Sequence, residues 1–90
     1  MDKAPVALIT GSTSGIGLEI ARKFVKEGHF VIQNARKMPN KNQIVGNDFF
    51  AADVTKKEEC EVLSKLVLSK YKNIDILICN KNYSISCILL

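Results

Sequence analysis

The sequence predicts an α/β fold with three layers, in which a parallel sheet of four strands is covered by helices on both faces. Strand-like and helix-like segments alternate along the chain, and the strand-like ones are short and almost wholly apolar. Continuous apolar strands are typical of parallel sheets that are buried on both faces. A glycine-rich stretch at residues 10–17, between the first strand and the first helix, is the third observation. Right-handed crossovers then favour the strand order 3-2-1-4.

The first half of the chain supplies a strand, a helix and a second strand. The apolar run at residues 6–10 is the first strand. Residues 16–27 then repeat apolar side chains at helical spacing, with charged side chains on the opposite side. Gly28 follows where a helix commonly ends. The second strand is expected to begin at Phe30 and to end near Asn34.

The second half adds a short crossover, a helix and two further strands. Residues 36–47 are rich in turn-forming side chains, and Pro39 limits any helix there to a turn or two. The third strand is expected at residues 48–52 and the fourth at residues 74–79.

A second helix is expected between those two strands. Thr55 is its candidate N-cap, because Glu58 three residues later completes a capping-box pattern. Asn73 is expected to end it. The predicted apolar face consists of Val62, Leu63, Leu66 and Val67, with Tyr71 as a further candidate.

Length and composition indicate one small folded domain. The 90 residues are 47% hydrophobic and 24% charged, a balance that disordered chains do not show. No apolar run approaches the roughly 18 residues of a membrane span, and the N-terminal residues lack the shape of a signal peptide, so a cytoplasmic location is expected. The net charge is +4, but the lysines are dispersed and form no basic stripe for nucleic acid. Without a Cys-x-x-Cys pair, no metal site is predicted.

The glycine-rich stretch is the strongest functional signal. Its glycines, Gly11, Gly15 and Gly17, have the spacing G-x-x-x-G-x-G between an apolar strand and an amphipathic helix. A strand, a glycine-rich turn and a helix together place backbone N–H groups and a helix N-terminus against a phosphate. One glycine allows the tight turn, one lets a diphosphate approach the backbone, and one lets helix and strand pack closely. The alternative is a glycine-rich turn that holds no ligand.

Four motifs in this order resemble the short-chain dehydrogenase/reductase family. They are residues 10–17, Arg36 after the second strand, residues 52–55 after the third strand and residues 73–80 at the fourth strand. The resemblance implies a Rossmann-like half-fold over residues 1–80 that binds a nicotinamide dinucleotide for an oxidoreductase. Residues 81–90 form a divergent apolar tail that does not resemble the family.

The cofactor-binding residues follow from these motifs. The turn and the start of the first helix should face the diphosphate, with hydroxyl donors from Ser12 and Ser14. The resemblance implies that Asp53 accepts from the adenine amino group, with the Val54 backbone nearby, and that Asn80 packs on the adenosine side and braces the glycine loop. Asp53 is otherwise a turn carboxylate, and Asn80 an ordinary strand-end residue. The expected set is Gly11, Ser12, Ser14, Gly15, Ile16, Gly17, Arg36, Asp53, Val54 and Asn80.

The end of the second strand decides which cofactor is expected. A carboxylate there would accept from the ribose 2′-OH and repel a 2′-phosphate. This chain has Arg36 and Lys37 and no carboxylate at that position. Because arginine pairs with phosphate bidentately, NADP(H) is preferred over NAD(H). The alternative for this pair is a solvated loop charge.

Catalysis by this chain alone is not expected. The family resemblance implies a Tyr-x-x-x-Lys motif, but Tyr71 is followed four residues later by Asp75 and Tyr83 by Cys87. No catalytic residue is therefore assigned. The chain is expected to be the cofactor-binding portion of an oxidoreductase, or else a dinucleotide-sensing or partner-pairing module, or a non-functional truncated isoform.

Two further expectations concern association. A fourth strand at the sheet edge invites self-association or pairing with a full-length relative. The last four residues, Cys87 to Leu90, fit the prenylation pattern C-a-a-X, although they also read as the accidental end of an apolar tail.

Overall fold

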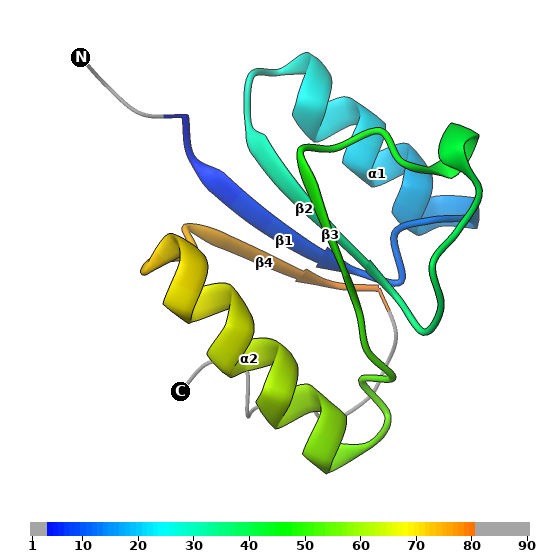
Figure 1. The fold of residues 1–90 in the computed structure, drawn as a ribbon. Helices are drawn as coiled ribbons and strands as arrows, with labels where there is room; N and C mark the ends of the chain where they lie inside the picture. Colours follow the sequence, from blue (N-terminus) through cyan, green and yellow to red (C-terminus); the bar gives the residue numbers. More distant parts are fainter. Residues whose placement is uncertain (1–3, 81–90) are drawn as a thin grey trace.

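The computed structural model describes residues 4–80, so the tail at 81–90, with Cys87, lies outside the described residues. Alternating strands and helices appear in the expected order (Figure 1). The elements are β1 (Val6–Thr10), α1 (Gly15–Lys26), β2 (Phe30–Ala35), the 3₁₀ turn η1 (Lys41–Gln43), β3 (Asp48–Ala51), α2 (Lys57–Tyr71) and β4 (Ile76–Cys79).

The four strands form one parallel sheet in the order β3-β2-β1-β4, which confirms the predicted topology. Leu8 of β1 lies opposite Ile32 of β2 on one side and opposite Leu77 of β4 on the other. Because all four strands are parallel, their carboxyl ends lie at the same edge of the sheet. The glycine-rich turn leaves β1 at that edge.

Helices on opposite faces of the sheet make the three layers seen in Figure 1. On the α2 face, Leu8 and Ile32 pack with Leu63 and Val67 of the helix. On the α1 face, Ile9 and Val31 pack with Ala21, and Val45 of the crossover joins them at the margin. Successive side chains of a strand point to opposite faces of the sheet, so the neighbours Leu8 and Ile9 of β1 pack in different cores.

The start of α2 differs from the prediction. The N-cap is Lys56 and makes no side-chain cap bond, so Thr55 is not the cap. The Thr55 hydroxyl instead donates to Asp53 Oδ1 at 2.6 Å. Threonine side chains bond to nearby turn groups as readily as to a helix start, and here the turn after β3 takes the hydroxyl.

The apolar face of α2 is also narrower than predicted. Val62 and Leu66 are 56% and 51% exposed, although both were expected to face the sheet. The buried positions are Cys60, Leu63, Ser64 and Val67. These four positions recur at helical spacing, and the helix is turned so that this row, rather than the row through residues 62 and 66, faces β1 and β2.

The crossover between β2 and β3 contains no α-helix, as Pro39 predicts. Its one regular element is η1, whose Asn40 N–H donates to Gln43 Oε1 at 2.9 Å. Further along, Asn47 and Val31 exchange two hydrogen bonds, from Asn47 N–H to the Val31 carbonyl at 2.8 Å and from Val31 N–H to Asn47 Oδ1 at 2.9 Å. The crossover therefore lies directly along β2. Neither helix within residues 4–80 has the length and apolar character to span a bilayer.

Candidate dinucleotide cleft

A cleft of about 860 Å³ opens at the carboxyl edge of the sheet. Four segments line it: the glycine-rich turn with the start of α1, the end of β2 with the crossover, the turn after β3, and the end of β4 at Asn80. Its lining includes Gly11, Ser14, Gly15, Ile16, Arg36, Asp53, Val54 and Asn80, which are eight of the ten residues predicted from sequence. Ser12 and Gly17 are not part of the lining.

The glycines of the turn have distinct structural roles. Gly11 and Gly15 have φ angles of +58° and +56°, in the left-handed region that side chains disfavour. Gly17 is buried in α1, where an added Cβ would lie 2.1 Å from the carbonyl oxygen of Gly11 and 2.8 Å from Asn80 Nδ2. Two glycines shape the turn, and the third allows the helix to touch it.

The N-terminus of α1 opens toward the cleft. Its N-cap, Ser14, makes no side-chain cap bond, and the first turn contains no acidic residue. The first amides of a helix have no intrahelical partner and carry a partial positive charge. Ser14 and Ile16 are both exposed. This helix end therefore favours an anion more than an acidic or capped helix start would.

Ser12 has a different role from the one expected. Its side chain is fully buried, and its hydroxyl donates to the Ile9 carbonyl at 2.7 Å while accepting from Asn34 N–H at 3.0 Å. A hydroxyl has a single hydrogen, which is used here within the protein. Ser12 joins the turn to β2 and presents no hydroxyl donor to the cleft.

Two polar side chains inside β2 were not singled out by the sequence analysis. Gln33 and Asn34 are buried, on opposite faces of the sheet. Asn34 Nδ2 donates to the carbonyls of Phe50 and Ala52 at 3.1 and 3.2 Å, and its Oδ1 accepts from Gly11 N–H at 3.4 Å. An amide pair in the interior of an apolar strand is the sequence signal that could have identified them, since buried polar groups need partners.

Asp53 is a turn carboxylate, which is the alternative role that the sequence offers for this residue. Its Oδ1 accepts from the N–H of Thr55 at 3.0 Å and from the Thr55 hydroxyl, and these bonds hold its pKa below the ordinary value. Nearby Lys56 and Arg36 lower the pKa in the same direction by their charge. Asp53 also lines the cleft, as does Val54, whose side chain is buried against the α2 core. Contact with adenine remains a prediction for both.

Asn80 braces the glycine-rich turn, as predicted. Its backbone N–H donates to Thr10 Oγ1 at 3.1 Å, and its side-chain Nδ2 donates to the Gly11 carbonyl at 2.9 Å. Both bonds join the end of β4 to the segment that leaves β1. A role beside the adenosine remains a prediction.

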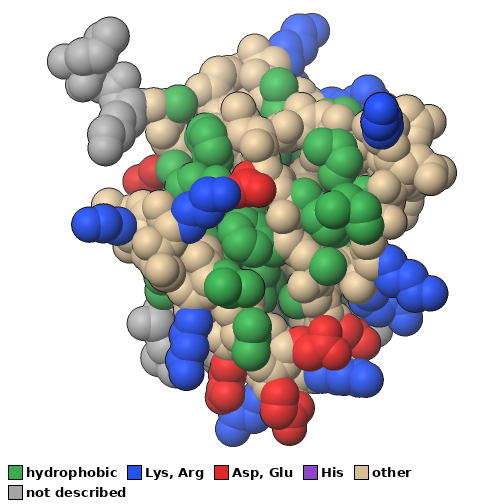
Figure 2. All heavy atoms as spheres, viewed as in Figure 1, with side chains coloured by type: hydrophobic (Ala, Val, Ile, Leu, Met, Phe, Trp, Pro, Cys, Tyr) green, Lys and Arg blue, Asp and Glu red, His purple; other side chains and the backbone are tan. Residues whose placement is uncertain are grey.

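The positive charges of the cleft come from the crossover. Arg36 and Lys37 are exposed, line the cleft and form no ion pair with any other residue in the range 4–80. Elsewhere the charges are scattered: on the face shown in Figure 2, most lysines and arginines lie near the margin, and one basic side chain lies beside an acidic one further in. The two cations are thus available to an anionic ligand in the cleft.

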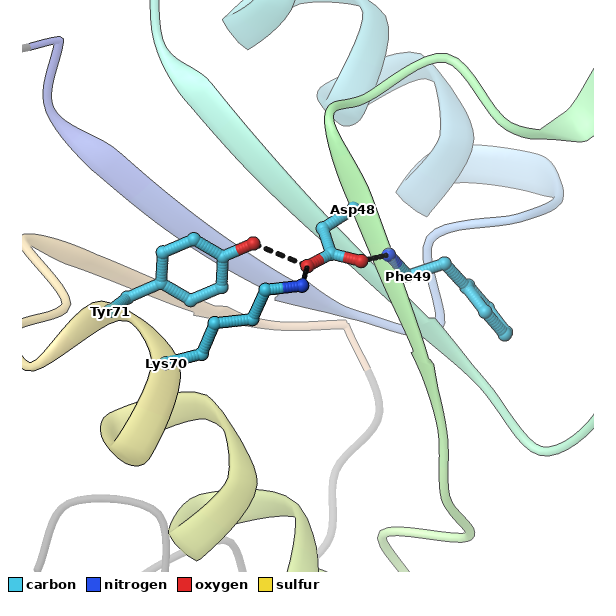
Figure 3. Close-up of polar contacts among 4 residues, drawn as sticks. All are labelled: Asp48, Phe49, Lys70 and Tyr71. Carbon is cyan, nitrogen blue, oxygen red and sulfur yellow. Dashed lines mark hydrogen bonds and ion pairs between the residues drawn. The ribbon is translucent and has the colours of Figure 1, made fainter.

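A second polar cluster lies away from the cleft, between β3 and the end of α2 (Figure 3). Asp48 Oδ2 accepts hydrogen bonds from the Tyr71 hydroxyl and from Lys70 Nζ, the latter at 2.9 Å. Burial and the bond to Asp48 raise the pKa of Tyr71 above its ordinary value. The two bonds join the end of α2 to the edge strand β3, and the raised pKa keeps the phenol of Tyr71 protonated.

Comparison with known proteins agrees with this geometry. A sequence model of the family described as short chain dehydrogenase matches residues 5–86. The dehydrogenase/reductase SDR family member 4 of Rattus norvegicus is 36% identical over 83 residues, covering 83% of this chain and 30% of the relative. The chain spans about a third of the length of the curated relatives it matches.

Two solved structures have the same architecture. The NADH-dependent reductase A1-R′ complexed with NAD superposes with a TM-score of 0.76 at 34% identity, covering 86% of this chain and 36% of that one. An actinorhodin polyketide ketoreductase with NADPH gives a TM-score of 0.71 at 38% identity, covering 86% of this chain and 33% of that one.

Proposed function

The chain belongs to the short-chain dehydrogenase family, and on this basis we propose that residues 1–80 form the NADP(H)-binding portion of a short-chain dehydrogenase/reductase-type oxidoreductase. The solved relatives named above were crystallised with NAD and with NADPH, so the family architecture accommodates both cofactors. The choice between them in this chain rests on its own residues.

One observation carries the proposal: the uncapped N-terminus of α1 and the positive-φ glycines lie in the same cleft as Arg36. A diphosphate on the turn would meet backbone N–H groups and the positive end of the helix dipole. Asp53, Val54 and Asn80 lie along the same cleft, where we assign them to the adenosine end of the cofactor. The Ser14 hydroxyl, which makes no side-chain cap bond, is free to bind a phosphate oxygen.

The preference for NADP(H) rests on the crossover. Arg36 and Lys37 supply two positive charges next to the end of β2. Among the described residues that line the cleft, the one carboxylate is Asp53, and one of its oxygens already accepts two hydrogen bonds from Thr55. A 2′-phosphate would therefore meet a guanidinium rather than a carboxylate.

We propose that this chain binds the cofactor without turning over a substrate by itself. Neither Tyr71 nor Tyr83 is followed by a lysine four residues later. Tyr71 is also engaged with Asp48 and does not line the cleft. Hydride transfer in the whole protein would thus depend on residues other than those found here.

Calorimetric titration of the 90-residue chain tests the binding proposal. NADPH should bind more tightly than NADH, and Ser14→Asp should weaken NADPH at least about tenfold, because like charges in contact cost several kcal/mol. Aspartate is a good N-cap, so the variant should melt no lower than the wild type. Ser69→Asp adds the same charge to an exposed position on α2 and should leave binding unchanged. A folded wild-type chain that binds neither dinucleotide contradicts the proposal.

A further inference from the structure

Gln33 uses every hydrogen-bonding position of its side-chain amide while fully buried in β2. Its Nε2 donates to the carbonyls of Ser12 and Gln43 at 2.7 and 2.9 Å. Its Oε1 accepts from the N–H groups of Val45 and Gly46, both at 2.8 Å. A primary amide offers two hydrogens and two main acceptor directions, so this side chain is saturated.

Three of these four bonds compensate for the irregular crossover. Side chains alternate along β2, so Gln33 shares the α1 face with Val31, where Val45 of the crossover also packs. The crossover has only the single turn η1, and its backbone groups lack the partners that a longer helix would give them. Gln33 satisfies the Gln43 carbonyl and the Val45 and Gly46 amides from within the sheet.

The fourth bond reaches the glycine-rich turn at Ser12. One side chain therefore holds two segments that line different parts of the cleft: the turn, with Ser14 and Gly15, and the crossover, with Arg36 and Gln43. An apolar side chain of the same size would leave four buried or half-buried backbone groups without this partner. The glycine-rich turn and the crossover, which form two walls of the cleft, would then be held together only by weaker contacts.

We propose that Gln33 is a positioning residue that fixes the crossover against the glycine-rich turn and so sets the affinity of the cleft for dinucleotide phosphates. This inference rests on the proposed function. Gln33 does not line the cleft, so it acts through the two segments it joins rather than by touching the ligand. Its amide carries no charge, so the link holds the walls without adding to the charge of the cleft.

The test compares two substitutions of Gln33 with a control in the other core. Gln33→Leu and Gln33→Met each remove all four hydrogen bonds without adding a charge near the cleft. Val67→Ala, in the α2 core, lowers stability without touching either cleft wall. NADPH affinity is measured by calorimetry on the full chain at a temperature where circular dichroism shows each protein folded. Amide hydrogen exchange of the Ser12 N–H is followed without ligand.

Loss of about tenfold or more in NADPH affinity in both Gln33 variants, with Val67→Ala unchanged, supports the proposal. Should one Gln33 variant fail to fold, the other carries the comparison. Equal affinities in the Gln33 variants and the control overturn it, while the proposed function stands. If the wild-type chain binds no dinucleotide, the proposed function has failed. Hydrogen exchange then tests by itself whether Gln33 holds the crossover against the glycine-rich turn. Faster exchange of Ser12 N–H in the Gln33 variants alone then supports the link between the walls, and unchanged exchange overturns it.

Discussion

The side-chain Nδ2 of Asn80 lies 2.9 Å from the carbonyl oxygen of Gly11 and donates a hydrogen bond to it. The two residues are 69 positions apart, at opposite ends of the described chain. Gly17 lies beside both atoms, with no room for a Cβ. These three residues hold the end of β4, the glycine-rich turn and the start of α1 in contact.

Removal of this brace should weaken the fold. In Asn80→Ala, the Gly11 carbonyl loses its partner while partly buried, and we expect the free energy of unfolding to fall by about 1–2 kcal/mol. Urea denaturation followed by circular dichroism measures the change. Asn73→Ala is the matched control, because Asn73 is exposed in the turn after α2. Equal stability of the two variants would refute the role of Asn80 as a brace.

Gly17→Ala should destabilise the protein, although alanine normally favours a helix over glycine by about 1 kcal/mol. The added Cβ would overlap the Gly11 carbonyl, which belongs to the backbone and cannot move aside cheaply. We expect a net loss of about 1–3 kcal/mol, as in other overpacked sites. Thermal unfolding gives the sign directly. Glu19→Ala, an exposed substitution two residues further along α1, controls for helix propensity, and a melting temperature of Gly17→Ala above that of the wild type would rule out the close contact.

Arg36→Ala should reduce the preference for NADPH. Hydrogen bonds to a charged group contribute about 1.5–3 kcal/mol, so the affinity for NADPH should fall about tenfold or more while the affinity for NADH changes little. Calorimetric titration of both cofactors measures the ratio. Lys41→Ala removes an exposed charge in η1 that does not line the cleft, and it should preserve the ratio. If the ratio of NADPH to NADH affinity is unchanged in Arg36→Ala, this arginine is a solvated loop charge that does not bind the 2′-phosphate.

The Asp48 cluster should make stability depend on acid. Burial disfavours the carboxylate, but hydrogen bonds from Tyr71, Lys70 and the Phe49 N–H together hold the pKa of Asp48 below 3.8. A carboxyl with a lowered folded-state pKa contributes stability above its unfolded pKa, and this contribution is lost as the pH falls through the folded pKa. The free energy of unfolding should therefore begin to fall below about pH 4.

Urea denaturation between about pH 6 and pH 2 measures this loss, and Asp48→Asn should make the profile shallower. Tyr71→Phe removes one of the donors and should give an intermediate slope. Glu61→Gln, an exposed residue of α2, is the control for losing one carboxyl. If the free energy of unfolding of Asp48→Asn falls with pH as steeply as that of the wild type, other carboxyl groups cause the acid dependence.

The edge position of β4 should promote association. Within residues 4–80, β4 pairs with β1 and has no strand on its other side, and apolar edge strands with free backbone groups recruit other chains. Sedimentation velocity of the 90-residue chain should show mass that rises with concentration. Cys79→Lys places a charge on this exposed edge position and should shift the chain toward monomer. A monodisperse wild-type monomer with a melt that dilution does not alter would contradict the expectation.

Structural features were predicted correctly from the sequence where a single physical property of the residues determines them. Apolar runs of three or four residues identified all four strands, and the glycine spacing located the turn between β1 and α1. Pro39 correctly limited helix in the crossover. Thr55 and Glu58 were misleading because a capping pattern and a turn pattern use the same residue types, and the structure gives the Thr55 hydroxyl to Asp53.

The rest of the site depends on contacts between distant segments. Val62 and Leu66 have the right spacing for a buried face, yet the rotation of α2 on the sheet leaves them about half exposed. The saturation of Gln33 requires the positions of Ser12 and Gly46, which the order of residues does not reveal. Ser12 looked like a phosphate donor because hydroxyls in such turns have that chemistry, but its hydrogen goes to Ile9.

The middle position of β1 also governs the order in which the protein can be made. Among the described elements, β1 leaves the ribosome first and β4, which pairs with its second side, leaves last. Strands that are far apart in the sequence pair slowly, because the entropy of a long loop is lost before the contacts between the strands stabilise the structure. Until β4 has been made, the nascent chain therefore carries a half-paired apolar strand, a condition in which unfinished proteins aggregate or bind chaperones.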